Sequence, residues 1–210
     1  RDGKMGQYGK RAVEQTNVYA DSYIYQGWDF NAGENYTPDP KDPTKMKKKG
    51  DVIHKNYTPV DVIFDFTAGL LGAKRQWFIL RDFENKWDLI AQYPEMGTKI
   101  LKVSQDNDTW SFMRAGAKGQ HSDDLIPVFR FIHDRTMAVP EGREFRFLGK
   151  DCWLTDTTLP KFYKKIPVYH LQGCAMDGSG FGYSPAFDLA PLQEAINGLI
   201  SIIITNQSTF

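Results

Sequence analysis

The C-terminal segment Ser184–Phe210 constrains the fold of this chain most, because it reads as one long amphipathic helix. Apolar residues recur in it at steps of three and four, which predicts one buried face. These residues are Leu189, Leu192, Ile196, Leu199 and Ile203. Polar residues fall off that stripe, among them Gln193, Asn197 and Ser201. The chain is therefore expected to end in a helix that needs a partner surface.

The same segment has signals for a helix start but none for an end. Ser184-Pro185 is a typical start, Asp188 is a favourable N-cap residue, and Pro191 is expected in the first turn, where a missing N–H costs nothing. No Gly, Pro or basic final turn follows Ile203. We therefore expect the helix to continue past Phe210 and the chain to be a piece of a longer polypeptide, or the ordered part of one.

Consecutive isoleucines near the end of this helix predict contact with other subunits. Ile202, Ile203 and Ile204 place apolar groups on several sides of a helix at once. Such a distribution is typical of a helix surrounded by neighbours, and it favours association if it is left exposed. The predicted oligomer interface is therefore Leu199, Ile202, Ile203 and Ile204.

The composition limits the possible partners. The chain has 26 Lys and Arg against 26 Asp and Glu, so its net charge does not attract nucleic acid or an anionic membrane over a distance. Two cysteines, Cys152 and Cys174, are too few for a disulfide scaffold and lack metal-site spacing. Uninterrupted apolar runs are far shorter than the roughly 20 residues of a membrane span. We expect no membrane partner and no cofactor.

Three compositional zones predict an α+β fold. Residues 1–50 combine a helix over Arg11–Tyr25 with a basic, Pro- and Gly-rich loop, and residues 51–183 form a β-rich domain with short helices. Residues 184–210 begin the long helix. In the β-rich zone, strands are predicted from β-branched and aromatic runs. These runs are Val52–Tyr57, Val60–Phe66, Gln76–Phe83, Val128–Ile132, Phe145–Leu148, Cys152–Thr155 and Pro167–Leu171.

Two short helices are predicted to interrupt the strands. Asn85 can cap a helix over Lys86–Tyr93, and a second helical segment covers Met96–Val103. Trp87 shares a helical face with Ile90, so both are predicted core residues. Trp77, in a predicted strand, is also assigned to the core.

The residues that could carry chemistry are scattered. No two histidines share a helical face, and the sequence has no HExxH motif, Cys/His cluster or nucleophile elbow. The alternative in a different class is a metal-dependent hydrolase that uses His133, Asp134 and His170. The prediction is a protein without catalytic, cofactor-binding or metal residues.

Two stretches of the chain together suggest a family resemblance. The first combines Asp61–Asp65, Trp77–Arg81 and the helix Asn85–Glu95, which contains Tyr93-Pro94. The second combines Leu159-Pro160, Ile166–Tyr169 and the approach to the terminal helix from Gly182 through Ser201 to Gln207. In this order, the two stretches resemble the portal proteins of tailed, especially short-tailed, bacteriophages. The resemblance covers roughly Asp51–Phe210.

The resemblance implies a non-enzymatic subunit of a ring, in that family a dodecamer, at one vertex of a virion. The ring would form the channel for DNA packaging and ejection and connect head to tail, after assembly in the host cytoplasm. Its partners would be further copies, the major capsid protein, a separate terminase, tail or adaptor proteins and double-stranded DNA. This chain would contain wing material and the start of the stem-directed helix. Another virion structural protein, such as a head-tail adaptor, is the nearest alternative.

Overall fold

A computed structural model describes residues 2–30, 32–39, 42–66, 74–106, 124–176 and 178–208. It divides the chain into two compact units. Unit 1 combines residues 1–59 with 167–210, and unit 2 is the intervening segment 60–166. Helices and antiparallel sheets occur together, which confirms the α+β class. The compact units divide the chain differently from the compositional zones, because unit 1 recruits strands from both ends of the chain.

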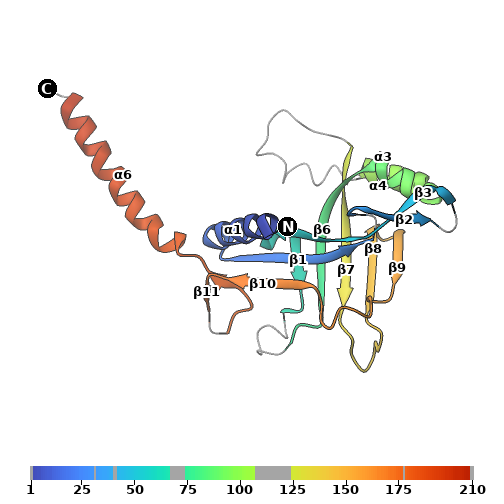
Figure 1. Cartoon of the computed structure of the whole chain (residues 1–210). Helices are drawn as coiled ribbons and strands as arrows, with labels where there is room; N and C mark the ends of the chain where they lie inside the picture. Colours follow the sequence, from blue (N-terminus) through green and yellow to red (C-terminus); the bar gives the residue numbers. More distant parts are fainter. Residues whose placement is uncertain are drawn as a thin grey trace. The chain divides into compact units, whose positions relative to one another are not determined.

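Unit 1 contains a three-stranded antiparallel sheet in the order β10-β1-β4, with α1 in contact with all three strands (Figure 1). Its remaining elements are two short hairpins and the terminal helix. The elements are α1 (Asp2–Tyr19), β1 (Asp21–Asp29), β2 (Asn35–Asp39), β3 (Asp42–Lys48), β4 (Asp51–Tyr57), β10 (Val168–Gln172), β11 (Cys174–Ala175), β12 (Gly182–Tyr183) and α6 (Ala186–Ser208).

The predicted helix over Arg11–Tyr25 is wrong in its position. The helix α1 already ends at Tyr19, because Ala20 adopts a left-handed conformation with φ 72°. Residues 21–25 then form the buried start of the central strand β1, where Tyr23 is fully buried. The sequence has no Gly or Asn at this position to mark the end of the helix. Pairing of β1 on both edges outweighs the weak helical pattern.

The remainder of the first zone is also not a simple loop. The strands β2 and β3 form an antiparallel hairpin, and most of the basic run Lys45–Lys49 lies in β3. Two-stranded ribbons tolerate proline because each strand has a free edge. Pro38 accordingly pairs with Met46 in this hairpin.

Unit 2 is built on a five-stranded antiparallel meander in the order β5-β6-β7-β8-β9 (Figure 1). The predicted strands and both short helices are confirmed, with ends that shift by a few residues. The elements are η1 (Pro59–Asp61), β5 (Val62–Phe64), β6 (Trp77–Asn85), α3 (Lys86–Gln92), η2 (Pro94–Met96), α4 (Gly97–Asp106), β7 (Leu125–His133), β8 (Arg143–Gly149) and β9 (Cys152–Thr157). The Asn85 side chain accepts the Trp87 N–H at 2.9 Å, so the predicted cap is confirmed as well.

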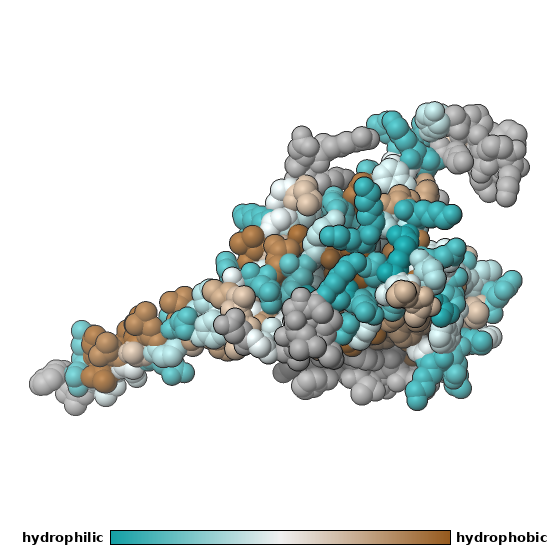
Figure 2. All heavy atoms as spheres, turned by 90° about the horizontal axis from the view of Figure 1, so that it is seen from below, coloured by the Kyte–Doolittle hydropathy of each residue, from teal (hydrophilic) through white to brown (hydrophobic). Residues whose placement is uncertain are grey.

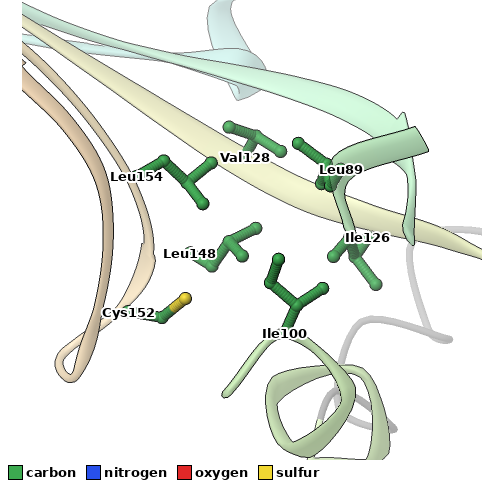
Figure 3. Close-up of a cluster of buried hydrophobic side chains, with 7 residues drawn as sticks. All are labelled: Leu89, Ile100, Ile126, Val128, Leu148, Cys152 and Leu154. Atoms are coloured by element: carbon green, nitrogen blue, oxygen red, sulfur yellow. The ribbon is translucent and has the colours of Figure 1, made fainter. Parts of the chain in front are cut away.

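The two helices of unit 2 cover a hydrophobic cluster on one face of the sheet (Figure 3). Side chains from α3, α4 and three strands point toward one another there. They are Leu89, Ile100, Ile126, Val128, Leu148, Cys152 and Leu154. Ile90 packs against this cluster and is partly buried, in line with its predicted core role.

The predicted core position of Trp87 is wrong. Its side chain is 55% exposed, whereas Leu89, two residues later, is fully buried. Residues two apart on a helix point in nearly opposite directions, so the seven-residue helix α3 cannot bury both toward one sheet. Trp87 instead donates from Nε1 to Asp124 at 3.1 Å. Trp77 is half-buried, and its ring stacks on Phe131 with centroids 6.2 Å apart.

Candidate functional site

The helix α6 is the strongest candidate for a functional surface. It has 23 residues, about 34 Å at the helical rise, and none of them is buried. Figure 2 shows its hydrophobic side chains exposed along the helix. Of the predicted interface residues, Leu199 is 62% exposed and Ile203 is 54% exposed, and Ile202 and Ile204 are similarly open. The structure therefore places these four residues on one solvent-facing element.

The start of α6 differs in detail from the prediction. Ser184 accepts the Ala186 N–H at 3.1 Å and so acts as the cap, with Pro185 next to it. Asp188 lies in the first turn, where a carboxylate is favourable, and accepts from the Tyr183 hydroxyl at 2.6 Å. This hydrogen bond is the main cause of the raised pKa of Tyr183. Pro191 lies inside the helix rather than in its first turn, because α6 begins earlier than expected. The expected continuation past Phe210 lies outside the described residues.

A buried polar network holds the base of α6 against the body of unit 1. Ser184 is fully buried and donates to the Asn17 carbonyl near the end of α1. Asp21, 1% exposed, accepts from Gly182 N–H at 2.9 Å and from His170 Nε2 at 2.7 Å. A side chain on Gly182 would lie 2.9 Å from the Ala20 carbonyl oxygen, so this position requires glycine. The helix is thus fixed at its base and unsupported along its length.

Several polar side chains of α6 form hydrogen bonds along the helix itself. Gln193 donates to Asn197 at 2.9 Å, and Thr205 donates to the Ser201 carbonyl at 2.8 Å. The last turn has no basic residue. These bonds satisfy polar side chains of α6 within the helix itself.

By length and composition, α6 is also long and apolar enough to cross a membrane, with a mean hydropathy of 1.3 over its best window. The length of uninterrupted apolar runs in the sequence did not predict this property. Scattered polar residues interrupt the apolar runs of α6, but the mean hydropathy of the helix stays high. One such helix is weak evidence for a membrane span. Glu194 lies near the middle of this helix, whereas Asp188 lies in its first turn. A charged residue near the centre of a span costs roughly 2.5–3.5 kcal/mol, which favours protein packing over lipid for this helix.

The residues of the alternative hydrolase site do not form a single site within either unit. His133 and Asp134 belong to unit 2, whereas His170 belongs to unit 1. The His133 imidazole contacts the backbone oxygen of Asp134, and the Asp134 carboxylate pairs with Lys74. His170 forms a hydrogen bond with Asp21, and its ring stacks on that of Tyr23 with ring centroids 4.5 Å apart. Among the described residues, no group of three His, Cys, Asp or Glu side chains could hold a metal ion.

An aromatic row on the unit 2 sheet was not predicted from the sequence. Phe131 stacks on Phe145 with ring centroids 4.8 Å apart, and Phe145 stacks on Trp153 at 5.2 Å. Phe129 and Phe147 form a neighbouring stacked pair at 5.4 Å. The signal is present as alternating Phe residues in the segments Phe129–Phe131 and Phe145–Phe147, since every second strand residue faces the same side. The row lies on the opposite side of the strands from the buried Val128, Ile132 and Leu148.

Charges next to this aromatic row are paired. Arg143 donates to Asp156 from two nitrogens, at 2.9 and 2.6 Å, and its guanidinium lies 5.5 Å from the Phe145 ring centroid. The hydrogen bond from Arg143 lowers the pKa of Asp156. Arg81 is paired in the same way with Asp61 at 2.6 Å. Both arginines are therefore neutralised by carboxylates of the same chain.

Comparison with protein-family models and with curated proteins gives no match for this chain. No protein-family model matches it, and no curated protein matches it at a significant level. The function is therefore inferred from the residues of the chain and their geometry.

Proposed function

We propose that this chain is a structural subunit of a ring-forming assembly, the portal of a tailed bacteriophage. The observation that carries the proposal is α6, a helix of 23 residues that is mostly apolar and has no buried residue. An exposed apolar surface of this size on a protein in water favours association. In the proposed assembly, neighbouring copies cover α6 and the helix points toward the channel through which DNA passes.

The buried base of α6 supports a structural role. Ser184, Asp21 and Gly182 fix the start of the helix to α1 and β1, so the exposed part projects from a defined position. A symmetric ring needs each copy to present the same surface at the same angle, because each subunit contacts its neighbour through a repeated interface. In α6, the start of the helix is held by hydrogen bonds and the remainder is exposed, so each copy can present the same surface to its neighbour.

The balance of charge is compatible with a DNA conduit. With 26 basic and 26 acidic residues, the chain lacks a general attraction for phosphates. A channel through which DNA slides works best without deep electrostatic minima. The other proposed partners are the major capsid protein, the terminase and tail or adaptor proteins, and the proposed location is the portal vertex of the virion. A head-tail adaptor would use the same exposed helix with a different partner.

The test is the assembly state of the purified full-length protein. Size-exclusion chromatography with light scattering and negative-stain imaging should show closed rings. The variant Ile203→Asp should disrupt them, because it places a charge in the apolar contact. The matched control is Ser201→Asp, which adds the same charge on the polar side of the same helix and should leave the rings intact. A monodisperse monomer, or rings formed equally by Ile203→Asp, would refute the proposal.

A membrane anchor is the second candidate, and the length and mean hydropathy of α6 favour it. The same preparation distinguishes the two. A membrane anchor would partition into detergent micelles or liposomes and would not form rings in detergent-free buffer. Rings in detergent-free buffer that do not float with liposomes would support the portal proposal.

A further inference from the structure

A pocket in unit 2 lies apart from the helix α6. It is formed between the turn segment after β7 and the segment that follows β9. Its volume is about 470 Å³, which is within the range of roughly 300–1,000 Å³ common for small-molecule sites. Its lining combines three cationic side chains with one carboxylate and several uncharged groups. The lining residues are Arg135, Pro140, Glu141, Thr158, Leu159, Lys161, Tyr163 and Lys164.

The walls of this pocket are held together by specific contacts. The Arg135 guanidinium donates to the carbonyl oxygens of Leu159 and Pro160, each at 3.0 Å, and to that of Tyr163. These bonds tie the segment after β9 to the segment after β7. Gly142 has φ 67°, and a side chain there would lie 2.9 Å from Leu159 Cβ, so the two segments approach closely. The pocket is therefore a defined part of the fold rather than a gap between loose loops.

The charge of the lining is positive. Among the lining residues that the structure describes, Arg135, Lys161 and Lys164 stand against Glu141, which gives a net charge of about +2 at neutral pH. The bonds of Arg135 go to neutral carbonyl oxygens, which leave its positive charge uncompensated. Among the described residues, the ion pairs of the chain involve neither of these two lysines. Both lysines are exposed and can turn toward a bound anion.

We propose that this pocket binds a small molecule that carries a phosphate group. A phosphate monoester has a charge of about −1.5 to −2 at neutral pH, which matches the lining. Lys161 and Lys164 supply charge-assisted hydrogen bonds to its oxygens, Arg135 adds positive charge, and the Thr158 hydroxyl supplies a neutral donor. Pro140 and Leu159 provide an apolar wall for the remainder of the molecule. The concave shape favours a free phosphate ester over the phosphates of a DNA duplex, which lie on a convex surface.

The test is isothermal titration of the purified chain with inorganic phosphate, ATP and a short DNA duplex. ATP should bind most tightly, and inorganic phosphate should compete with it. Replacing both pocket lysines, Lys161→Ala with Lys164→Ala, should weaken ATP binding by about a hundredfold, a tenfold loss for each charge-assisted contact. Glu141→Gln should tighten binding, because it removes the one carboxylate that lines the pocket.

The matched control is Lys165→Ala. Lys165 is exposed and lies in the same segment as the two pocket lysines, but it does not line the pocket. It should change the affinity for ATP by less than about threefold. Thermal unfolding should be similar for all these variants, since the replaced side chains are exposed. The proposal is overturned if neither ATP nor phosphate binds, if the lysine replacements leave the affinity unchanged, or if only the duplex binds. Assembly state is measured separately, so this result does not depend on the portal proposal.

Discussion

Replacement of Ile100 tests the core of unit 2 most directly. Ile100 lies on α4, is fully buried, and faces Leu89, Leu148 and Cys152 in the cluster of Figure 3. Ile100→Ala removes three carbon groups, worth about 2.4 kcal/mol of transfer free energy at about 0.8 kcal/mol each. Helices and sheet enclose the resulting cavity, so only partial collapse is expected. The total loss should be about 3–4 kcal/mol, within the roughly 2–5 kcal/mol measured for such substitutions.

The assay is urea unfolding combined with alkylation of Cys152. Burial raises the pKa of the Cys152 thiol, and the side chain is 1% exposed, so it should react only when the cluster opens. A Cys174→Ser background removes the exposed second thiol. In that background Ile100→Ala should accelerate alkylation by about two to three orders of magnitude, at 1.4 kcal/mol for each factor of ten.

The control for this prediction is the adjacent residue on the same helix. Leu101 is 39% exposed, so Leu101→Ala should lower the free energy of unfolding by less than about 1 kcal/mol. Equal losses for the two variants, or a loss below about 1 kcal/mol for Ile100→Ala, would show that α4 does not cover the sheet as described.

Three further predictions concern unit 2. Trp87→Ala should lower the free energy of unfolding in urea by less than about 1 kcal/mol, because the indole is exposed; a loss above about 3 kcal/mol would restore its predicted core role. Arg143 lowers the pKa of Asp156, so the stability from this pair should be present above the ordinary carboxyl pKa and be lost as the pH falls through the lowered value. Arg143→Ala should raise the Asp156 pKa in an NMR titration and remove that part of the acid dependence. Gly142→Ala should lower the melting temperature through its positive φ and its contact with Leu159, at a cost of about 1–3 kcal/mol, and an unchanged melting temperature would contradict the left-handed turn.

The sequence predicted the meander of unit 2 well because its signals are local. Runs such as Gln76–Phe83 and Val128–Ile132 combine β-forming residues with clear boundaries, and Asn85 marks a helix start by its own side chain. Local sequence signals gave a wrong prediction where pairing with a distant strand determines the secondary structure. Asp21–Tyr25 has a weak helical pattern, but it becomes a strand because β4 and β10 pair with it from distant parts of the chain.

The candidate surface was partly predictable. The isoleucines at 202–204 are enough to indicate a helix with exposed apolar residues, because three adjacent residues cannot share one helical face. The buried base of this helix was not predictable. Asp21, His170 and Gly182 are separated by up to 161 positions in the sequence, and only the fold brings them within hydrogen-bonding distance.

Local sequence signals were sufficient for the strands and short helices of unit 2 and for the apolar composition of α6. Tertiary contacts were needed to establish which side of α3 is buried, how the two ends of the chain combine into unit 1, and how Arg135 closes the pocket beside Leu159. The physical reason is the range of the interactions. Propensity and capping act between neighbours in the chain, whereas burial and charge compensation depend on residues that meet only after folding.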